Sequence, residues 1–445
     1  MTSVDHASAR ADKYAPIEPA LALHAAGALT QAEAAYRRLL GSGKAHVEAQ
    51  HYLGVLLHQR GETRKGIALI LAALEADADS ACRFNDLGNV LFQAGDLANA
   101  ATAFDCAVRL SGGDANVWNN LGTIRHRQGR IADAESAYRS ALRSDATFAP
   151  ALNNLAALLA ATGNEEESSL LSCRAFIQPP LAGKHPKMLG IAYYRLERIA
   201  EAADCYRNWL RAEPDNAVAL HHLAACTGEN VPSRAPDGFL TAVFDDVAER
   251  YEEKLVGKLS YRGPEIIAGL LSGCVAPDRT RRVLDGGCGT GLCARVLLPC
   301  AKHLTGVDIS SGMLARARES ALYDELVEAE LCGYLAQRKN EFDLIVMADT
   351  LMYFGDLAPL FAAAGRALRP AGAFAFTVEA AVESAQRPLD YRLSPSGRYR
   401  HSRRYLAQEL ESAGFALARS DDAALRSEFG TPTPGIGVLA RLLPG

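Results

Sequence analysis

Small and apolar residues in the first half of the chain recur with a period of 34 residues. One column consists of Gly27, Gly61, Gly95, Gly129 and Gly163. A second consists of Leu53, Leu87, Leu121, Leu155, Leu189 and Leu223, and the first five leucines are followed by Gly54, Gly88, Gly122, Ala156 and Gly190. Two more columns hold Ala73, Ala107, Ala141 and Ala175, and the aromatic residues Tyr36, Phe104, Tyr138 and Tyr206. Four columns in one register indicate an internal repeat.

The period and the residue types resemble the tetratricopeptide repeat, which implies two short antiparallel helices in each unit. The small residue after each leucine would let the two helices approach closely, and the aromatic residue would fill the gap to the next unit. The glycine between the helices would supply a positive φ. The resemblance implies an α-solenoid over residues 13–227, with about six repeats and a capping helix at 217–226. The first and fifth registers match poorly, and the junction at Gln178-Pro179-Pro180 looks irregular.

Asparagines occupy the fifth position of three predicted first helices, at Asn85, Asn119 and Asn153. Asparagine can hydrogen-bond an extended peptide backbone without adding charge. The concave face of the repeats is therefore predicted to bind a protein or peptide. A structural or homodimerising role for the array is the alternative.

A different pattern begins after the stretch 228–238, which is rich in Gly, Pro and Ser and predicts a linker. From Arg282 onward, short apolar runs alternate with helical segments, as in a parallel sheet with crossover helices. Candidate strands span 282–286, 303–307, 326–329, 342–347, 372–378, 414–419 and 436–441. The fold class is thus α followed by α/β, with residues 1–12 expected to form a flexible N-terminus.

A glycine-rich turn follows the first of these strands, in the sequence VLDGGCGTG at 283–291. Its glycines would let the backbone approach a ligand, and the helix that follows would offer unpaired N–H groups. The dinucleotide pattern G-x-G-x-x-G fails, because the sixth position from Gly287 is Leu292. Asp308 ends the next strand, 19 residues after Gly289, where a carboxylate could accept hydrogen bonds from both hydroxyls of a ribose.

These two features resemble motifs I and II of the class I S-adenosylmethionine-dependent methyltransferases. The span 239–441 also resembles a bacterial family of predicted methyltransferases with tetratricopeptide repeats, notably in FDDVAERYEEKLVGKLSYRGPE (244–265), ALYDEL (321–326), FDLIVMADTLMYFGDL (342–357) and SGRYRHSRRYL (396–406). The resemblance implies a Rossmann-like, seven-stranded methyltransferase domain at 239–445 with S-adenosylmethionine as its cofactor.

The resemblance also assigns cofactor-binding roles to individual residues. Gly287, Gly289 and Gly291 would pass under the methionine part, Asp308 would hold the ribose, Met313 would pack against adenine, Glu330 would meet the adenine amino group, and Asp349 would lie beside the transferable methyl. Gly286 departs from the usual aliphatic residue, and Glu330 from the commoner Asp. Asp285 would either contact the cofactor or serve only as a structural residue at the strand end.

The candidates for acid–base chemistry are less sharply defined. His401 is the first choice as a general base because its ordinary pKa is near neutrality, and Tyr353 and Glu379 follow it. The sequence ADTLMY differs from the motif of enzymes that methylate exocyclic amino groups, which argues against such substrates. The segment 387–405 interleaves arginines with tyrosines and is predicted to form a lid, in which Arg398, Arg400 and Tyr399 bind an anionic substrate.

Composition narrows the remaining possibilities. The chain has 445 residues, of which 49% are hydrophobic and 22% charged, as expected for two or three folded domains. The net charge of −5 argues against a nucleic-acid partner, and ten cysteines without a CxxC pair argue against a disulfide scaffold or a metal site. No signal peptide or membrane span is expected, so the predicted location is cytoplasmic. The predicted activity is methylation of an anionic small molecule or a carrier-bound metabolite. A protein methyltransferase, an RNA methyltransferase and a non-catalytic scaffold are the alternatives.

Overall fold

The computed structural model describes residues 17–42, 46–245, 248–251, 259–381, 390–428 and 430–444. The chain forms two compact units, Met1–Gln178 and Pro179–Gly445. The division falls at the junction that the repeat pattern marked as irregular. Residues 1–12, predicted to be a flexible N-terminus, lie outside the described residues. No helix in the described parts of the chain is long and apolar enough to cross a membrane.

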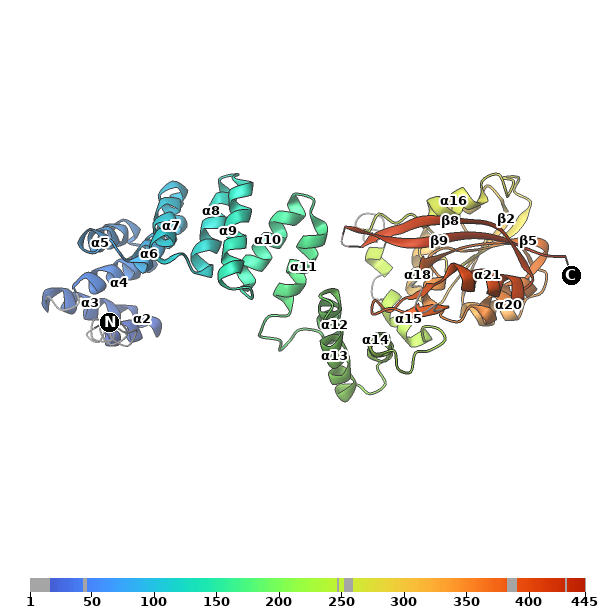
Figure 1. Cartoon of the computed structure of the whole chain (residues 1–445), viewed down its shortest axis with the longest axis horizontal. Coiled ribbons are helices and arrows are strands. Elements are labelled where there is room, and N and C mark those ends of the chain that lie inside the picture. The colour runs from blue at the N-terminus through green and yellow to red at the C-terminus, as the bar shows by residue number, and fades with distance from the viewer. Residues whose placement is uncertain are drawn as a thin grey trace. The chain divides into compact units, whose positions relative to one another are not determined.

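The first unit consists of helices that follow one another as antiparallel pairs (Figure 1). They are α2 (Glu18–Ala25), α3 (Leu29–Ser42), α4 (His46–Gln59), α5 (Thr63–Ala76), α6 (Ala81–Gln93), α7 (Leu97–Ser111), α8 (Ala115–Arg127), α9 (Ile131–Ser144), α10 (Ala149–Ala161) and α11 (Glu165–Phe176). All five glycines of the first column adopt positive φ, from 75° at Gly27 to 87° at Gly61. The turn conformation predicted for this column is confirmed.

Close approach of paired helices explains the second glycine column. A Cβ built on Gly88 would lie 2.8 Å from the ring of Phe104, and one on Gly122 would lie 2.7 Å from the ring of Tyr138. Both rings are buried in the apolar layer between successive pairs. The aromatic residue therefore occupies the space that the glycine leaves, and the helices pack closely because the side chain is absent.

The second unit begins with helices of the same kind, α12 (Pro186–Arg195), α13 (Ile199–Ala212) and α14 (Ala217–Thr227). The last of these agrees with the predicted capping helix. The stretch 228–238, predicted as a linker, is packed against the following domain instead. Ala235 is fully buried and its amide donates to the Tyr353 carbonyl at 2.7 Å, while the Ser233 carbonyl accepts from the amides of Gly355 and Asp356 at 2.8 Å. The last two residues of this stretch begin helix α15 (Asp237–Phe244), and its composition did not show that the extended backbone before this helix is held in place.

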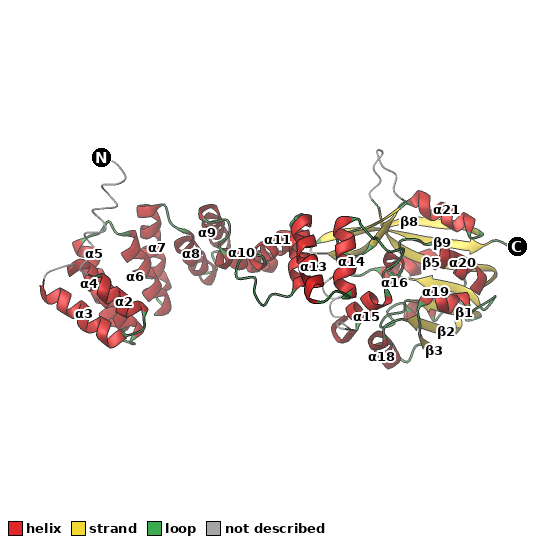
Figure 2. Cartoon of the chain, turned by 90° about the horizontal axis from the view of Figure 1, so that it is seen from below, coloured by secondary structure: helices red, strands yellow, loops and turns green. Residues whose placement is uncertain are grey.

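The remainder is a nine-stranded sheet with helices on both faces (Figure 2). Its strands are β1 (Arg281–Gly286), β2 (Ala301–Asp308), β3 (Glu325–Glu328), β4 (Phe342–Met347), β5 (Leu368–Ala380), β6 (Tyr391–Leu393), β7 (Tyr399–His401), β8 (Phe415–Glu428) and β9 (Thr431–Leu442). β3, β2, β1, β4 and β5 run parallel in that order, and β9 joins β5 and β8 in antiparallel pairing. All seven predicted strands are present, and β6 and β7 are additional.

Alternating side chains of the central strands build two separate apolar cores. Val283, Leu344 and Val346 pack with α16 (Gly263–Leu271) and α17 (Ala294–Leu297). Their neighbours Leu284 and Ile345 enter a larger core on the opposite face, which includes residues of α19 (Leu331–Ala336), α20 (Ala358–Ala367) and α21 (Arg403–Ser412). Two covered faces explain why the parallel strands are apolar throughout. The polar residues that follow these strands are thereby gathered at one edge of the sheet.

Candidate functional site

A cavity lies where β1, β2 and β4 end, the usual location of ligands in open α/β sheets. Its lining includes seven of the eight predicted cofactor residues: Asp285, Gly287, Gly289, Asp308, Met313, Glu330 and Asp349. Gly291 belongs to the same turn but is not part of the lining. One cavity thus brings together residues spread over more than 60 positions of the chain.

The backbone conformation of the turn and the space around it explain why glycines occupy it. Gly287 and Gly289 have φ values of +72° and +54°, which favour glycine. A Cβ on Gly287 would lie 2.4 Å from Oγ1 of Thr350, whereas one on Gly289 would meet nothing within 4 Å. The backbone at Gly289 is therefore open for a ligand to approach.

Two carboxylates flank this turn. Asp308 accepts from the Gly289 amide at 2.8 Å and from the Ser310 amide at 2.9 Å, so the strand end and the turn are tied together. Each carboxylate oxygen retains capacity for a further hydrogen bond. Asp285 is buried and accepts from the Tyr323 hydroxyl at 2.6 Å, and burial raises the pKa of Asp285 to about 7. A ligand cation at this position would favour its ionised form.

The opposite end of the cavity contains Met313 and Glu330. Met313 is buried, and its amide donates to the N-capping Ser310 of α18 (Ser311–Glu319). Glu330 caps α19, where it accepts from the amides of Cys332 at 3.0 Å and Gly333 at 2.6 Å. Arg234, from the stretch predicted as a linker, also lines the cavity, with its Nε 3.9 Å from Glu330.

Five aromatic residues line the cavity: Phe244, Tyr251, Tyr261, Tyr353 and Phe354. Phe244 packs edge-on against Tyr353, with ring centroids 5.4 Å apart. Burial is the main cause that raises the pKa of Tyr251 and Tyr261, so both phenols are neutral at physiological pH. Only Tyr353 was predicted as a site residue. Phe244, Tyr251 and Tyr261 occur in the segment 244–265, whose resemblance to the family was noted without assigning roles.

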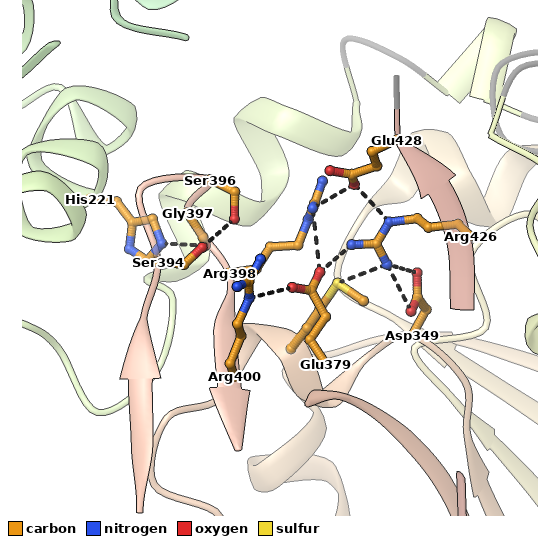
Figure 3. A network of polar contacts seen from close by, with 11 residues as sticks. His221, Asp349, Glu379, Ser394, Ser396, Gly397, Arg398, Arg400, Arg426 and Glu428 are labelled. Atoms are coloured by element: carbon orange, nitrogen blue, oxygen red, sulfur yellow. Dashed lines mark hydrogen bonds and ion pairs between the residues drawn. The ribbon is translucent and has the colours of Figure 1, made fainter. Parts of the chain in front are cut away.

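Charged side chains form a network around Asp349, with Arg426 and Glu379 buried at its centre (Figure 3). Arg426 of β8 contacts Asp349, Glu379 and Glu428, and Nη1 is 3.0 and 3.2 Å from the two Asp349 oxygens. Arg398 reaches Glu428 at 2.6 Å and Glu379 at 3.4 Å, and Arg400 reaches Glu379 at 3.3 Å. Three arginines thus face three carboxylates. Glu379, a predicted acid–base residue, is a buried member of this network and does not line the cavity.

The geometry does not support the role predicted for His401. Its side chain is completely buried, its Nε2 donates to the Gly355 carbonyl at 3.2 Å, and it is not part of the cavity lining. Burial lowers the pKa of His401 to about 4, so its ring is neutral and inside the fold. The prediction assumed a loop over the substrate, but His401 is the last residue of β7, which pairs with β5.

The predicted lid is likewise an extension of the sheet. Residues 382–389 lie outside the described residues, while β6 and β7 pair with each other and β7 pairs with Glu379 and Ala380 of β5. Tyr399, predicted to bind substrate, is fully buried and donates its hydroxyl to the Pro232 carbonyl at 2.5 Å. Arg398 and Arg400 are partly exposed, but both are paired with carboxylates and neither lines the cavity.

The asparagines of the repeats differ from one another in their surroundings. Asn119 is only 9% exposed and accepts from the side-chain amide of Asn154 at 2.9 Å, so it joins α8 to α10, the first helices of successive repeats. Asn153 is exposed and Asn85 is half-buried. Of the three residues predicted to bind a partner, only Asn153 is freely accessible.

Family models match both parts of the chain. A methyltransferase-domain model matches residues 284–376, and a tetratricopeptide-repeat model matches residues 20–81 and 85–148. The chain combines tetratricopeptide repeats with a Rossmann-like methyltransferase domain. The matched methyltransferase segment contains the glycine turn, Asp308, Glu330 and Asp349, and the cofactor that such a domain implies is S-adenosylmethionine.

The chain is similar to several individual methyltransferases. A ubiquinone biosynthesis O-methyltransferase from Aromatoleum aromaticum is 33% identical over 22% of this chain and 43% of its own length. A malonyl-[acyl-carrier protein] O-methyltransferase from Enterobacter lignolyticus is 27% identical over 44% of this chain and 71% of its own length. A solved S-adenosylmethionine-dependent methyltransferase from Mesorhizobium loti is 25% identical over 40% of this chain and 97% of that chain, with a TM-score of 0.32. The chain spans only 19% of a bifunctional biotin biosynthesis protein and less than half of the ubiquinone enzyme.

The residues of the methyltransferase domain fit S-adenosylmethionine. The open backbone at Gly289 can lie against the methionine part, and the buried carboxyl of Asp285 suits its ammonium group. Asp308 can accept from ribose hydroxyls, and the apolar side chain of Met313 suits an adenine face. An acid-rich lining with aromatic walls also suits the positive charge of a sulfonium.

Proposed function

We propose that the chain is an S-adenosylmethionine-dependent O-methyltransferase that acts on an anionic small molecule or a carrier-bound metabolite. The observation that supports this most is the convergence of Asp285, Asp308, Glu330 and the glycine turn on one cavity, with aromatic walls at its Asp349 end. The names of two relatives describe O-methyltransferases, one of them acting on a malonyl group carried by a protein.

The bound cofactor would supply a methyl group on a good leaving group, so positioning contributes much of the catalysis. Asp308 and Glu330 would fix the two ends of the nucleoside, and the glycine turn with Asp285 would fix the amino-acid part. Phe244, Tyr251, Tyr261 and Tyr353 would exclude water from the methyl end. A carboxylate acceptor needs no general base, which agrees with the burial of His401 away from the cavity.

The partly exposed Arg398 and Arg400 would attract the anionic substrate. Arg400 is the better candidate, because its contact with Glu379 uses Nε, and Nη1 and Nη2 have no partner among the described residues. Both arginines belong to the hairpin β6–β7. This hairpin pairs with β5 at Glu379 and Ala380, which follow Phe376, the last residue of β5 that pairs with β4. This pairing supports a position for both arginines towards the end of the sheet that holds the cavity.

A decisive test combines binding and turnover. We expect the purified chain to bind S-adenosylmethionine in calorimetry and to transfer labelled methyl to the free carboxylate of a carrier-bound dicarboxylic acyl group or of a small acid. Arg400→Gln should raise KM for that acceptor without changing cofactor affinity, and the exposed Arg404→Gln serves as control. Absence of cofactor binding by the folded chain would refute the proposed activity.

The repeats would bind a protein partner, such as the carrier of the substrate. A protein methyltransferase is the second candidate, because a helix of the repeat type contacts the hairpin that carries Arg398 and Arg400. The Nε2 of His221 in α14 donates to the Gly397 carbonyl at 2.9 Å, and Gly397 directly precedes Arg398. Transfer of label to a protein side chain, and not to a carrier-bound acid, would favour that candidate.

The domain boundaries need a corresponding revision. We propose that residues 179–227 fold together with the methyltransferase domain, although they belong to the repeats by sequence. Ala224 and Ala225 of α14 pack with Leu393 and Tyr399 of the β6–β7 hairpin in one apolar cluster.

A further inference from the structure

The edge strand β8 lies beside the methyl end of the cavity, and the function proposed above assigns it no role. Its residue Arg426 is 4% exposed and comes from a hairpin that no motif in the sequence marked. Each of its three nitrogens contacts a carboxylate: Nη1 contacts Asp349, Nη2 contacts Glu379, and Nε contacts Glu428 at 2.8 Å. A guanidinium used in this way has little capacity left for a substrate.

Asp349 is the only one of these three carboxylates that lines the cavity. It follows β4 with φ +57°, a conformation that costs energy for a residue other than glycine and that surrounding contacts must maintain. Its amide donates to Oγ1 of Thr377 at 2.8 Å, and Arg426 contacts both carboxylate oxygens. Backbone and side chain of Asp349 are thus fixed from β5 and from β8.

The backbone on both sides of Arg426 fixes a second wall of the cavity. The Leu425 carbonyl accepts from the Arg262 amide at 2.9 Å, and the Ser427 amide donates to the Leu259 carbonyl at 2.6 Å. Tyr261, which lines the cavity, lies between these two contacts. One short stretch of β8 therefore positions both Asp349 and Tyr261.

From this geometry we infer that Arg426 is a positioning residue, which holds Asp349 as an ionised carboxylate facing the cofactor sulfonium. The inference rests on the proposed function. The charged and titratable groups around Asp349 are Arg426 and Glu428 of β8, Glu379 of β5, Arg398 of the turn before β7, and Cys293, Tyr251, Tyr261 and Tyr353 of the cavity wall. Burial raises the pKa of Asp349, and Arg426 is the largest influence that lowers it again.

The consequence is a preference for the charged cofactor over its demethylated product. S-adenosylmethionine carries a sulfonium where S-adenosylhomocysteine has a neutral sulfur, and the two molecules share every other ionisable group. The ratio of their dissociation constants therefore isolates the charge at sulfur and cancels titration of the shared groups. An ionised Asp349 favours the sulfonium, whereas a protonated Asp349 does not.

The test measures this ratio by calorimetry on the full chain from pH 6 to pH 9. At pH 6 we expect the Arg426→Gln variant to prefer S-adenosylmethionine about tenfold less than the wild type does, because Asp349 binds a proton when Arg426 is absent. The preference of this variant should return as the pH rises and Asp349 ionises. Asp349→Asn should give the low preference at every pH. Arg419→Gln, on the same strand but in an exposed pair with Asp421, should match the wild type.

Arg426→Lys covers the case in which Arg426→Gln does not fold, since the lysine keeps the positive charge. It should retain most of the preference and show little pH dependence. The inference would be overturned if Arg426→Gln preferred S-adenosylmethionine as strongly as the wild type at every pH. It would also be overturned if Arg426→Lys lost this preference while Asp349→Asn retained it. Failure of the wild-type chain to bind either ligand would instead refute the proposed function.

Discussion

The repeats and the methyltransferase cavity are built from contacts of very different reach along the chain. In the repeats, side-chain contacts join residues about one period apart, such as Asn119 with Asn154 and His58 with Gln93, both 35 positions apart. Around the cavity, Arg426 contacts Asp349 across 77 positions, and Tyr399 contacts Pro232 across 167. In the repeats the same packing contacts recur in many units, whereas the cavity depends on single residues from distant strands.

Among the substitutions considered, we expect the largest effect on cofactor affinity when Asp308 is replaced. Replacing Asp308 by Ala removes an acceptor for two ribose hydroxyls and frees the amides of Gly289 and Ser310. Hydrogen bonds to a charged group are worth about 1.5–3 kcal/mol each, so we expect cofactor affinity to fall at least about a hundredfold. Calorimetry on the full chain measures this loss.

Asp421→Ala is a matched control, because Asp421 belongs to β8, outside the cavity lining. It should leave the affinity unchanged. Equal affinity in Asp308→Ala and the wild type would mean that other residues hold the ribose.

The two glycine columns of the repeats should respond to alanine in different degrees. Gly122→Ala places a Cβ 2.7 Å from the Tyr138 ring, and overpacking of this kind costs about 1–3 kcal/mol. Gly129→Ala meets no atom within 4 Å, so its cost is the strain of a positive φ, about 1 kcal/mol. Chemical denaturation should rank Gly122→Ala as the more destabilised.

Cofactor affinity should be unchanged in both glycine variants, because neither residue belongs to the unit that contains the cavity. A loss of affinity in Gly122→Ala would show that the two units do not act independently.

Low pH should destabilise the second unit through its buried histidines. Burial lowers the pKa of His401 to about 4 and that of His222 to about 3, from an ordinary value near 6.5. Between those values the unfolded chain binds protons that the folded chain does not, so stability is complete above pH 6.5 and falls as pH decreases towards 4. From pH 7 to pH 5 we expect His401 alone to contribute a loss of about 2 kcal/mol.

His401→Phe isolates that contribution, since phenylalanine can keep the stacking against Tyr405 without titrating. The stability difference between the wild type and this variant should shrink or reverse by about that amount over the same pH range. If the difference is constant from pH 7 to pH 5, His401 does not titrate as its burial implies.

The features that were predicted correctly are those that depend on local or periodic patterns in the sequence. The glycine turns, the close helix contacts and all seven predicted strands follow from the spacing of small and apolar residues. Seven of the eight predicted cofactor residues line the cavity, because Gly287, Gly289 and Asp308 occur at strand ends with motif spacing, but most of the other lining residues were not predicted.

The errors share a physical cause. His401 and Tyr399 are polar residues in an arginine-rich run, and composition indicated an exposed lid. Pairing of β7 with β5 and with β6 buries both side chains, and this pairing involves residues that no local pattern connects. Arg426 was missed for the same reason, because its three carboxylate partners become neighbours only when β8 joins the sheet through β9.

The smallest predicted effect concerns the asparagines of the repeats and tests whether that column serves the fold or a partner. Asn119 is buried and accepts from Asn154, so Asn119→Ala would leave the Asn154 amide without this acceptor and should cost about 1 kcal/mol of stability. Asn153 is exposed, and Asn153→Ala should change stability by less than about 0.5 kcal/mol. If the concave face binds a partner through this column, Asn153→Ala should weaken partner capture at unchanged stability, whereas Asn119→Ala should weaken it only to the extent that it loosens the helices. A stability loss in Asn153→Ala as large as in Asn119→Ala would indicate that the whole column is structural, and the partner surface would then have to be sought among other residues of the repeats.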